Sequence, residues 1–229
     1  MGPGICIAID GPASSGKGTV ARRVAKALGY AYVDTGAMYR SVALVALERG
    51  VPLEDGLGLG ALAASLRFGF AWSLEGLRVI VDGRDVSSRI RAEAVGQAAS
   101  AVATRPEVRS ALLALQRELG AAGGVVMDGR DIGTVILPAA ELKVYLDASV
   151  DERARRRHAE LCARGVDVRY GAVRAELHQR DAQDKQRDVA PLRRAEDAVL
   201  IDSTGLEADA VVRAVLQLAH ERGAVAHPV

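Results

Sequence analysis

The segment DGPASSGKGT, at residues 10–19, constrains the fold more than any other part of the chain. Two glycines, Gly11 and Gly16, flank four residues and are followed at once by Lys17; the apolar run ICIAI precedes the segment and a stretch of helical period follows it. In such a strand–loop–helix unit the backbone N–H groups curl inward, and the helix N-terminus adds partial positive charge. The segment therefore predicts a phosphate-binding loop in which Lys17 reaches the terminal phosphates of a nucleotide. The alternative is a glycine-rich turn that binds nothing.

Short apolar runs, each bounded by Asp, Gly or Ser, alternate along the chain with longer stretches of helical period. The runs are ICIAID, YAYVD, GVVMD, LKVYLD and AVLIDS. Because they are apolar along their whole length, both faces of these strands are expected to be covered. The sequence therefore predicts an α/β fold with a parallel sheet flanked by helices.

One region departs from this alternation of apolar runs and helical stretches. Residues 66–86 contain two runs with partial alternation of apolar and polar residues, joined by the turn Glu75-Gly76, and this pattern predicts a β-hairpin. A helical stretch over residues 93–104 follows the hairpin. We interpret the hairpin and this helix as an inserted lobe. The predicted boundaries are 65–105 for the lobe, and 1–64 with 106–229 for the core.

The tetrapeptide DGRD occurs twice, at residues 82–85 and 128–131, in different contexts. The first copy ends a strand of the predicted hairpin, where Asp-Gly is ordinary turn chemistry, and its Arg is expected to be solvated. The second copy follows the buried run GGVVM, so its charged side chains are expected at the carboxyl edge of the parallel sheet, where open α/β folds bind ligands. Context therefore favours a functional role for the second copy only.

Charge and cysteine content narrow the class of partner. The formal net charge of the 229 residues is +1, which supplies no broad basic field for nucleic acid or a membrane surface and favours a small-molecule partner. Cys6 and Cys162 lie far apart and suggest neither a disulfide framework nor a metal site, so a reducing, cytoplasmic setting fits best. The first apolar run is only five residues long and lacks a basic leader, so it predicts neither a signal peptide nor a membrane span.

The loop departs from the general phosphate-loop motif in one detail. The residue after Lys17 is Gly18, and the hydroxyl comes one place later at Thr19, which leaves direct coordination of Mg²⁺ by Thr19 open. The variant GKGT is similar to the loop of nucleoside monophosphate kinases. A GTPase would also need an N-K-x-D motif to read guanine, and the chain contains no Asn.

The segment YVDTGAMYR, residues 32–40, has the same strand, turn and helix-start pattern. Thr35 and Gly36 are expected near the helix N-terminus, with Arg40 within its first turn. A hydroxyl, backbone donors and a guanidinium could therefore converge on one anion. The alternative is a helix cap followed by a surface Arg.

The segment QRDAQDKQRDVAPL places Arg180, Asp184 and Arg187 at i, i+4 and i+7, which predicts that they share one face of a helix. Two interpretations stay open for this face. It is either a row of ligand-binding side chains or a solvated stripe of ion pairs.

Together these segments resemble bacterial cytidylate kinases. The match runs in order through GPASSGKGT, DTGAMYR, DVSSRIR, ASAVATRPEVR, MDGRDIGT, LDAS and DERARRR with one intervening Val, and RDAQDKQRDVAPL to IDST, and so covers most of the chain. The resemblance implies a P-loop NTPase fold whose inserted lobe, 65–105, binds the acceptor nucleotide, with a helical lid at about residues 151–168. It also implies ATP-dependent phosphorylation of CMP and dCMP by in-line transfer, with Mg²⁺ accompanying ATP.

The resemblance further assigns site residues in three groups. The ATP-binding residues would be Gly11, Pro12, Ala13, Ser14, Ser15, Gly16, Lys17, Gly18, Thr19 and Arg156. The CMP-binding residues would be Thr35, Gly36, Arg40, Ser100, Arg109, Arg130, Asp131, Arg180, Asp184 and Arg187. Catalysis would depend on Lys17, Arg130, Arg153, Arg157 and Arg187.

Within the CMP group, the implied base-reading residues are Ser100, Arg109 and Asp131. A carboxylate at Asp131 can accept from the exocyclic amine of cytosine while Arg109 donates to the ring acceptors, and uracil offers a carbonyl in place of the amine. The implied phosphate ligands are Arg40, Arg130, Arg187 and Thr35, and the implied sugar neighbours are Arg180 and Asp184. In the lid, the residues implied to close over the triphosphate are Arg153, Arg156 and Arg157, with Arg155 left on the surface. Asp128 would organise Mg²⁺ through water.

Three other functions share some of these features. A kinase for AMP, UMP or shikimate would have the loop but should lack the inserted lobe and the base-reading set. A nucleotide-gated binding module would bind ATP yet turn over slowly with every acceptor. A nucleic-acid binder that uses its arginines conflicts with the near-zero net charge. We expect a monomer, because no strong oligomerisation signal appears.

Overall fold

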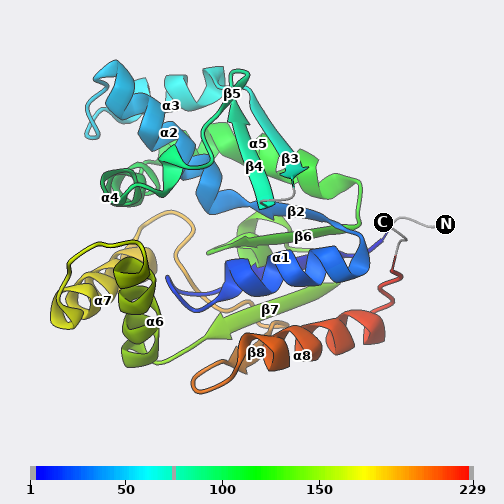
Figure 1. The fold of residues 1–229 in the computed structure, drawn as a ribbon. Coiled ribbons are helices and arrows are strands. Elements are labelled where there is room, and N and C mark those ends of the chain that lie inside the picture. Colours follow the sequence, from blue (N-terminus) through cyan, green and yellow to red (C-terminus); the bar gives the residue numbers. More distant parts are fainter. Residues whose placement is uncertain (1–3, 74–75, 227–229) are drawn as a thin grey trace. The chain divides into compact units, whose positions relative to one another are not determined.

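The computed structural model describes residues 4–73 and 76–226. The chain divides into two compact units, which are described separately below: the core unit, residues 1–32 and 120–229, and the middle unit, residues 33–119. The predicted inserted lobe, residues 65–105, falls wholly within the middle unit. Both units are drawn in Figure 1.

The five apolar runs form the five strands of the main sheet, as predicted. They are β1 (Cys6–Asp10), β2 (Ala31–Asp34), β6 (Val125–Gly129), β7 (Leu142–Asp147) and β8 (Val199–Asp202). The strand order is β2-β6-β1-β7-β8, and β1 pairs in parallel with both β6 and β7, while β7 pairs in parallel with β8. Ile7 and Ile9 of β1 are completely buried, as expected for a central strand covered on both faces. The expectation is wrong for β8, which lies at the edge of the sheet and whose Leu200 is 50% exposed.

Helices of the core unit pack on this sheet and on each other (Figure 1). Helix α1 (Lys17–Leu28) begins directly after the phosphate loop and packs against β6 and against α8 (Ala208–Glu221). Helices α6 (Val150–Ala163) and α7 (Tyr170–Gln186) pack against each other through an apolar cluster that includes Leu161, Val173 and Leu177. Across the described residues, no helix is both long enough and apolar enough to cross a membrane.

Each strand of the main sheet has an aspartate at or next to its carboxyl end. These residues are Asp10, Asp34, Asp128, Asp147 and Asp202. In a parallel sheet the carboxyl ends of the strands share one edge, and the helix N-termini that follow face the same edge. The fold therefore brings Asp10 of β1 and Asp128 of β6 beside the phosphate loop that leaves β1.

The middle unit consists of helices around a small antiparallel sheet. Its elements are α2 (Thr35–Arg49), α3 (Gly56–Ser65), β3 (Phe68–Ser73), β4 (Gly76–Val81), β5 (Arg84–Asp85), a 3₁₀ turn (Arg89–Arg91), α4 (Glu93–Val102) and α5 (Pro106–Ala121), the last of which continues into the core unit. Its apolar core includes Met38, Val42, Leu59, Val102 and Leu112. The predicted helix over 93–104 corresponds to α4.

The predicted hairpin corresponds to β3 and β4, which pair antiparallel, and β5 extends the sheet by a further antiparallel pair. The turn predicted at Glu75-Gly76 includes a residue outside those described. Helix α3 was not predicted. Its sequence, GLGLGALAAS, is rich in glycine, which disfavours an isolated helix. A Cβ atom on Gly60 would lie 2.7 Å from the Cβ of Glu107, so a close approach to α5 requires glycine there.

Candidate active site

The phosphate loop joins β1 to α1 and has the backbone that the sequence predicts. A Cβ atom on Gly11 would lie 2.1 Å from the carbonyl oxygen of Leu146, so the loop passes β7 at a distance that only glycine allows. Ser14 has φ 60° and Gly16 has φ 93°, both in the left-handed region. Alternation of this kind turns successive N–H groups toward one concave side, which is the geometry that binds phosphate oxygens.

Lys17 is the first residue of α1 and lies under this loop. Its side chain is 8% exposed, and Nζ donates to the carbonyl oxygen of Pro12 at 2.9 Å. Burial, followed by repulsion from Arg130, lowers the pKa of Lys17 to about 7, while Asp128 opposes the shift. A buried amine with only partial charge compensation is stabilised by a bound anion, so Lys17 is suited to the polyphosphate of a nucleotide.

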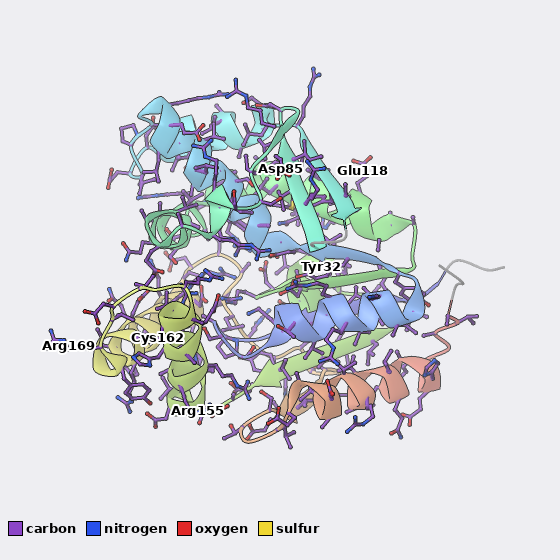
Figure 2. All side chains as sticks on the ribbon, in the orientation of Figure 1. Tyr32, Asp85, Glu118, Arg155, Cys162 and Arg169 are labelled. Carbon is purple, nitrogen blue, oxygen red and sulfur yellow. The ribbon has the colours of Figure 1, made fainter. Side chains whose placement is uncertain are left out.

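Asp128 faces the loop from the neighbouring strand β6. The residue is 5% exposed, and its carboxylate accepts a hydrogen bond of 2.9 Å from the hydroxyl of Tyr32, which Figure 2 labels on β2. A Cβ atom on Gly18 would lie 3.7 Å from Oδ2 of Asp128, so the glycine that replaces the usual hydroxyl residue leaves the carboxylate close to the loop. Thr19 is exposed. A hard oxygen ligand beside a phosphate site fits Mg²⁺ held through water.

The second DGRD segment continues from β6 and meets α7. Arg130 Nε donates to Asp184 Oδ2 at 2.7 Å, and Arg187 Nη2 lies 3.4 Å from Asp131 Oδ1. The side chains of Asp131 and Arg187 are each only 5% exposed. Although burial disfavours its charge, Asp184 has a lowered pKa because Arg130 and, more weakly, Arg180 and Arg187 stabilise the carboxylate. Five of the predicted CMP-binding residues therefore interact within the core unit: Arg130, Asp131, Arg180, Asp184 and Arg187.

The position of Arg187 differs from the prediction of one shared helical face. Helix α7 ends at Gln186, and Arg187 is its C-cap with φ −63° and ψ 140°. The backbone N–H of Leu192 donates to the carbonyl oxygen of Asp184 at 2.8 Å. In a longer helix that carbonyl oxygen would accept from a residue of the next turn, so the helix ends here. Arg187 therefore reaches Asp131 from the loop that follows α7, while Arg180 and Asp184 are on the helix.

The first DGRD segment has a different environment, as predicted. Asp82 and Gly83 have φ 49° and 78° and form the two-residue turn between β4 and β5. Arg84 is exposed, while Asp85, labelled in Figure 2, accepts hydrogen bonds from Ser87 and from Arg78. These bonds, that from Ser87 above all, lower the pKa of Asp85 to about 2. Asp85 therefore stabilises its own hairpin.

The arginines of α6 fall into two classes. Arg153 is buried, pairs with both carboxylate oxygens of Asp181 at 3.0 and 2.6 Å, and donates to the carbonyl oxygen of Ala13 in the phosphate loop at 3.2 Å. Arg156 donates to the carbonyl oxygen of Ser15 in the same loop at 3.2 Å.

Three arginines of α6 also pair with glutamates of their own helix, and Arg156 does so with Glu152 at 2.7 Å. Arg157 pairs with Glu160 at 3.1 Å. Arg155, labelled in Figure 2, has a side chain that is 69% exposed and pairs with Glu152. Arg153 and Arg156 thus both donate to the phosphate loop.

In the middle unit, the start of α2 brings three of the predicted acceptor residues together. Asp34 is the N-cap: its Oδ1 accepts from the backbone N–H of Ala37 at 2.9 Å, and its Oδ2 accepts from Arg40 at 2.7 Å. Thr35, the first helical residue, is 4% exposed, and a Cβ atom on Gly36 would lie 3.0 Å from Arg40 Nη1. Arg40 is in the second turn of the helix, not in the first as predicted. The helix cap is therefore present, Arg40 pairs with the capping Asp34, and Thr35, Gly36 and Arg40 lie together at the start of α2.

The two remaining base-reading candidates lie on α4 and α5 of the same unit. Ser100 Oγ donates to the carbonyl oxygen of Gly96 at 3.3 Å. Arg109 is 7% exposed; its guanidinium carbon lies 5.6 Å from the ring centre of Tyr39, and Nη1 donates to the carbonyl oxygen of Ala103 at 3.4 Å. Tyr39 was not predicted, and its spacing from Arg109 gives no sequence signal. An arginine stacked on an aromatic ring is held in one orientation at low entropic cost.

Comparison with known proteins identifies the family of this chain. The family model for cytidylate kinase matches residues 7–221. The curated cytidylate kinase of Exiguobacterium sibiricum is 51% identical over 215 residues, which cover 94% of this chain and 96% of that protein. The curated cytidylate kinase of Carboxydothermus hydrogenoformans is 48% identical over 212 residues, which cover 93% of this chain and 96% of that protein.

Among solved structures, the fold is similar to a gluconokinase from Sinorhizobium meliloti 1021, with a TM-score of 0.50 and 16% identity over 96% of this chain and 94% of that one. It is also similar to an uncharacterized protein from Eubacterium ventriosum, with a TM-score of 0.51 and 10% identity over 94% of this chain and 98% of that one. These two likenesses concern the α/β fold. The family match over nearly the whole sequence is more specific, and the chain belongs to the cytidylate kinase family.

Proposed function

We propose that the protein transfers the γ-phosphoryl group of ATP in line to a phosphate oxygen of CMP or dCMP. The new P–O bond forms as the bond to ADP breaks, so no covalent enzyme intermediate is needed. ATP-dependent phosphorylation of CMP is the activity of the family to which the chain belongs. The observation that carries the proposal is that, within the core unit, Lys17 of the phosphate loop lies near the largely buried cluster of Arg130, Asp131, Asp184 and Arg187.

On the donor side, the loop residues 11–19 would hold the triphosphate. Their inward N–H groups and Lys17 supply positive potential where charge develops on the transferred group. Arg153 and Arg156 support this role because both donate to carbonyl oxygens of the loop. With Arg157, they belong to the segment 151–168 that we propose as the lid. Closure of such a lid would exclude water and suppress hydrolysis of ATP.

On the acceptor side, Arg130 and Arg187 of the core unit, with Arg40 and Thr35 of the middle unit, would bind the phosphate of CMP. Several guanidinium groups also offset the repulsion between two polyanionic substrates. Arg180 and Asp184 would bind near the sugar. We propose that the lobe, 65–105, binds the acceptor nucleotide.

For the base, Asp131 would accept from the exocyclic amine of cytosine, and Arg109 and Ser100 would contact the ring acceptors. This assignment is supported by the burial of Asp131 and Arg109, because a buried polar group that loses its partner costs binding energy and so discriminates between bases. Uracil presents a carbonyl oxygen to the carboxylate of Asp131 and should be rejected.

Mg²⁺ is the proposed cofactor and would enter with ATP. Asp128 would hold one of its water molecules, and Thr19 is the further candidate ligand. When bound, the ion would neutralise charge on the transferring phosphates. Within the described residues there is no group of three or more His, Cys, Asp or Glu side chains that could hold a metal ion by themselves, so most ligands would come from phosphate and water.

We also propose that the protein acts as a monomer in the cytoplasm.

A panel of acceptors tests the proposed substrate. With ATP and Mg²⁺, a coupled assay of ADP release should show that CMP and dCMP are the best acceptors, with kcat/KM for UMP and AMP lower by about tenfold or more. A kinase with another acceptor would favour AMP, UMP or shikimate. A nucleotide-gated binding module would release ADP slowly with every acceptor. Either pattern would contradict the proposal.

The low pKa of Lys17 makes a separate prediction about ATP binding. At pH 8 a lysine with a pKa near 7 is about 90% uncharged in the free protein, and bound phosphates should restore its proton. Binding should therefore take up close to one proton and weaken as the pH rises above 7. Calorimetric titration with MgATP, without CMP, in buffers of different ionisation enthalpy measures this uptake. It should disappear in Lys17→Arg, whose side chain stays charged; equal uptake in both proteins would contradict the prediction.

A further inference from the structure

Asp10 is the last residue of β1, directly before the phosphate loop, and it holds the segment that follows the second DGRD copy. Its Oδ1 accepts from the backbone N–H of Ile132 and its Oδ2 from the N–H of Gly133, each at 2.8 Å. The side chain is 5% exposed. Both oxygens of one buried carboxylate are therefore engaged by two consecutive amides that come directly after Asp131.

These two amides begin a short irregular helical turn, Ile132–Ile136, and have no acceptor within it. The carbonyl oxygen of Asp131 accepts from the N–H groups of Val135 and Ile136 at 2.9 and 3.2 Å. The backbone of Asp131 is thus fixed from its carboxyl side by this turn, and the turn is fixed by Asp10. Every hydrogen bond in this chain of contacts lies inside the core unit.

The carboxylate of Asp10 is costly to bury. Desolvation raises its pKa to about 6, with the amides of Gly133 and Ile132 acting against the shift, repulsion from Asp131 adding to it and Lys17 reducing it. An uncharged residue would avoid this cost but could not accept from two adjacent N–H groups in the same way, because an amide would direct its NH₂ group at one of them. A requirement for two acceptor oxygens explains why a carboxylate is placed here.

We propose that Asp10 is a positioning residue for base recognition: it clamps the turn after Asp131 and so holds the Asp131 carboxylate at the cytosine amine. Asp10 also directly precedes Gly11 of the phosphate loop in the chain. The position of this one residue therefore affects both the donor loop and the segment that would read the acceptor base. The inference rests on the proposed role of Asp131 as the reader of the base, and it gives Asp10 a part in choosing the acceptor, although both carboxylate oxygens of Asp10 are bonded to backbone amides.

The test compares Asp10→Asn with the parent protein. This variant keeps the shape of the side chain but replaces one acceptor oxygen by a donor. We expect kcat/KM for CMP to fall by about tenfold or more and the ratio of kcat/KM for CMP to that for UMP to fall with it, while KM for ATP changes by less than about threefold. In amide spectra of ¹⁵N-labelled protein, the signals of Ile132 and Gly133 should shift. An unchanged CMP/UMP ratio would overturn the proposal, because a residue that only stabilises the fold lowers activity with both acceptors alike.

Two further variants control this comparison. Asp55→Asn is the matched control, because Asp55 also accepts from a backbone N–H at a helix start, that of Gly58 at 2.9 Å, but is exposed and outside the proposed site. It should leave both acceptors unaffected. If Asp10→Asn does not fold, Asp10→Ser replaces it, since a hydroxyl keeps one acceptor without charge; the same loss of CMP/UMP discrimination is expected.

Asp131→Asn separates failure of this inference from failure of the proposed site. If Asp131→Asn lowers the CMP/UMP ratio and Asp10→Asn does not, only the positioning role is wrong. If Asp131→Asn leaves the ratio unchanged, the proposed base recognition is wrong and the inference falls with it. If both roles are right, the double variant should show no further loss of the ratio beyond Asp131→Asn alone, because the two residues act through one contact.

Discussion

Lys17→Met should lose at least about a thousandfold in kcat/KM for ATP and CMP, equivalent to about 4 kcal/mol of transition-state stabilisation. The substitution keeps an apolar stem of similar length and removes only the ammonium group that would neutralise the transferring phosphates. It should not destabilise the free protein, because it also removes a buried amine whose charge is disfavoured there. The variant should therefore lose activity while its melting temperature stays equal to or above that of the parent.

Lys26→Met is the matched control for this prediction. Lys26 is on the same helix, α1, but its side chain is exposed and has no proposed role. Steady-state kinetics of the control should stay within about twofold of the parent, as expected for a surface substitution. If Lys17→Met kept more than a tenth of the parent kcat/KM, the phosphate loop would not be the donor site.

Asp131→Asn and Asp85→Asn should differ strongly, although both alter the last residue of a DGRD segment. Asp131→Asn should reduce kcat/KM for CMP by about ten- to two-hundredfold and should reduce the preference for CMP over UMP, because an amide can donate to the carbonyl of uracil. Asp85→Asn should leave the kinetics within about twofold of the parent, since Asp85 accepts hydrogen bonds from Arg78 and Ser87, which lie next to it in the small antiparallel sheet and in the segment that follows.

Thermal melting accompanies these kinetic measurements. Asp131 lies 3.4 Å from Arg187 with both side chains buried, so Asp131→Asn is expected to cost some stability, and kinetics must be taken well below the transition. Equal kinetic damage from the two substitutions would contradict the distinction between the two DGRD segments.

The sheet and the phosphate loop were predictable because their signals are local. Each strand is a continuous apolar run ended by a polar residue, and the glycine spacing with Lys17 appears within ten residues of sequence. The different environments of the two DGRD segments were likewise predictable from the residues before them, since one follows an alternating strand and the other a buried run. The structure confirms both placements.

Other features depend on contacts between distant residues, which spacing cannot reveal. The bond from Ile132 to Asp10 joins residues 122 positions apart, and the pair of Arg153 with Asp181 joins two helices. Helix α3 exists because its glycines allow close packing against α5, so tertiary contacts override a poor local propensity. Arg187 could not be assigned to the C-cap of α7, because the turn there depends on the backbone N–H of Leu192.

The central claim is that the second DGRD segment reads the acceptor base, and a crystal structure of the protein with CMP bound tests it most directly. We predict that a carboxylate oxygen of Asp131 lies within about 3.2 Å of the exocyclic amine of cytosine, with Arg130 and Arg187 bonded to the CMP phosphate. A structure in which the cytosine amine is bonded by other groups and Asp131 makes no contact with the base would contradict the claim.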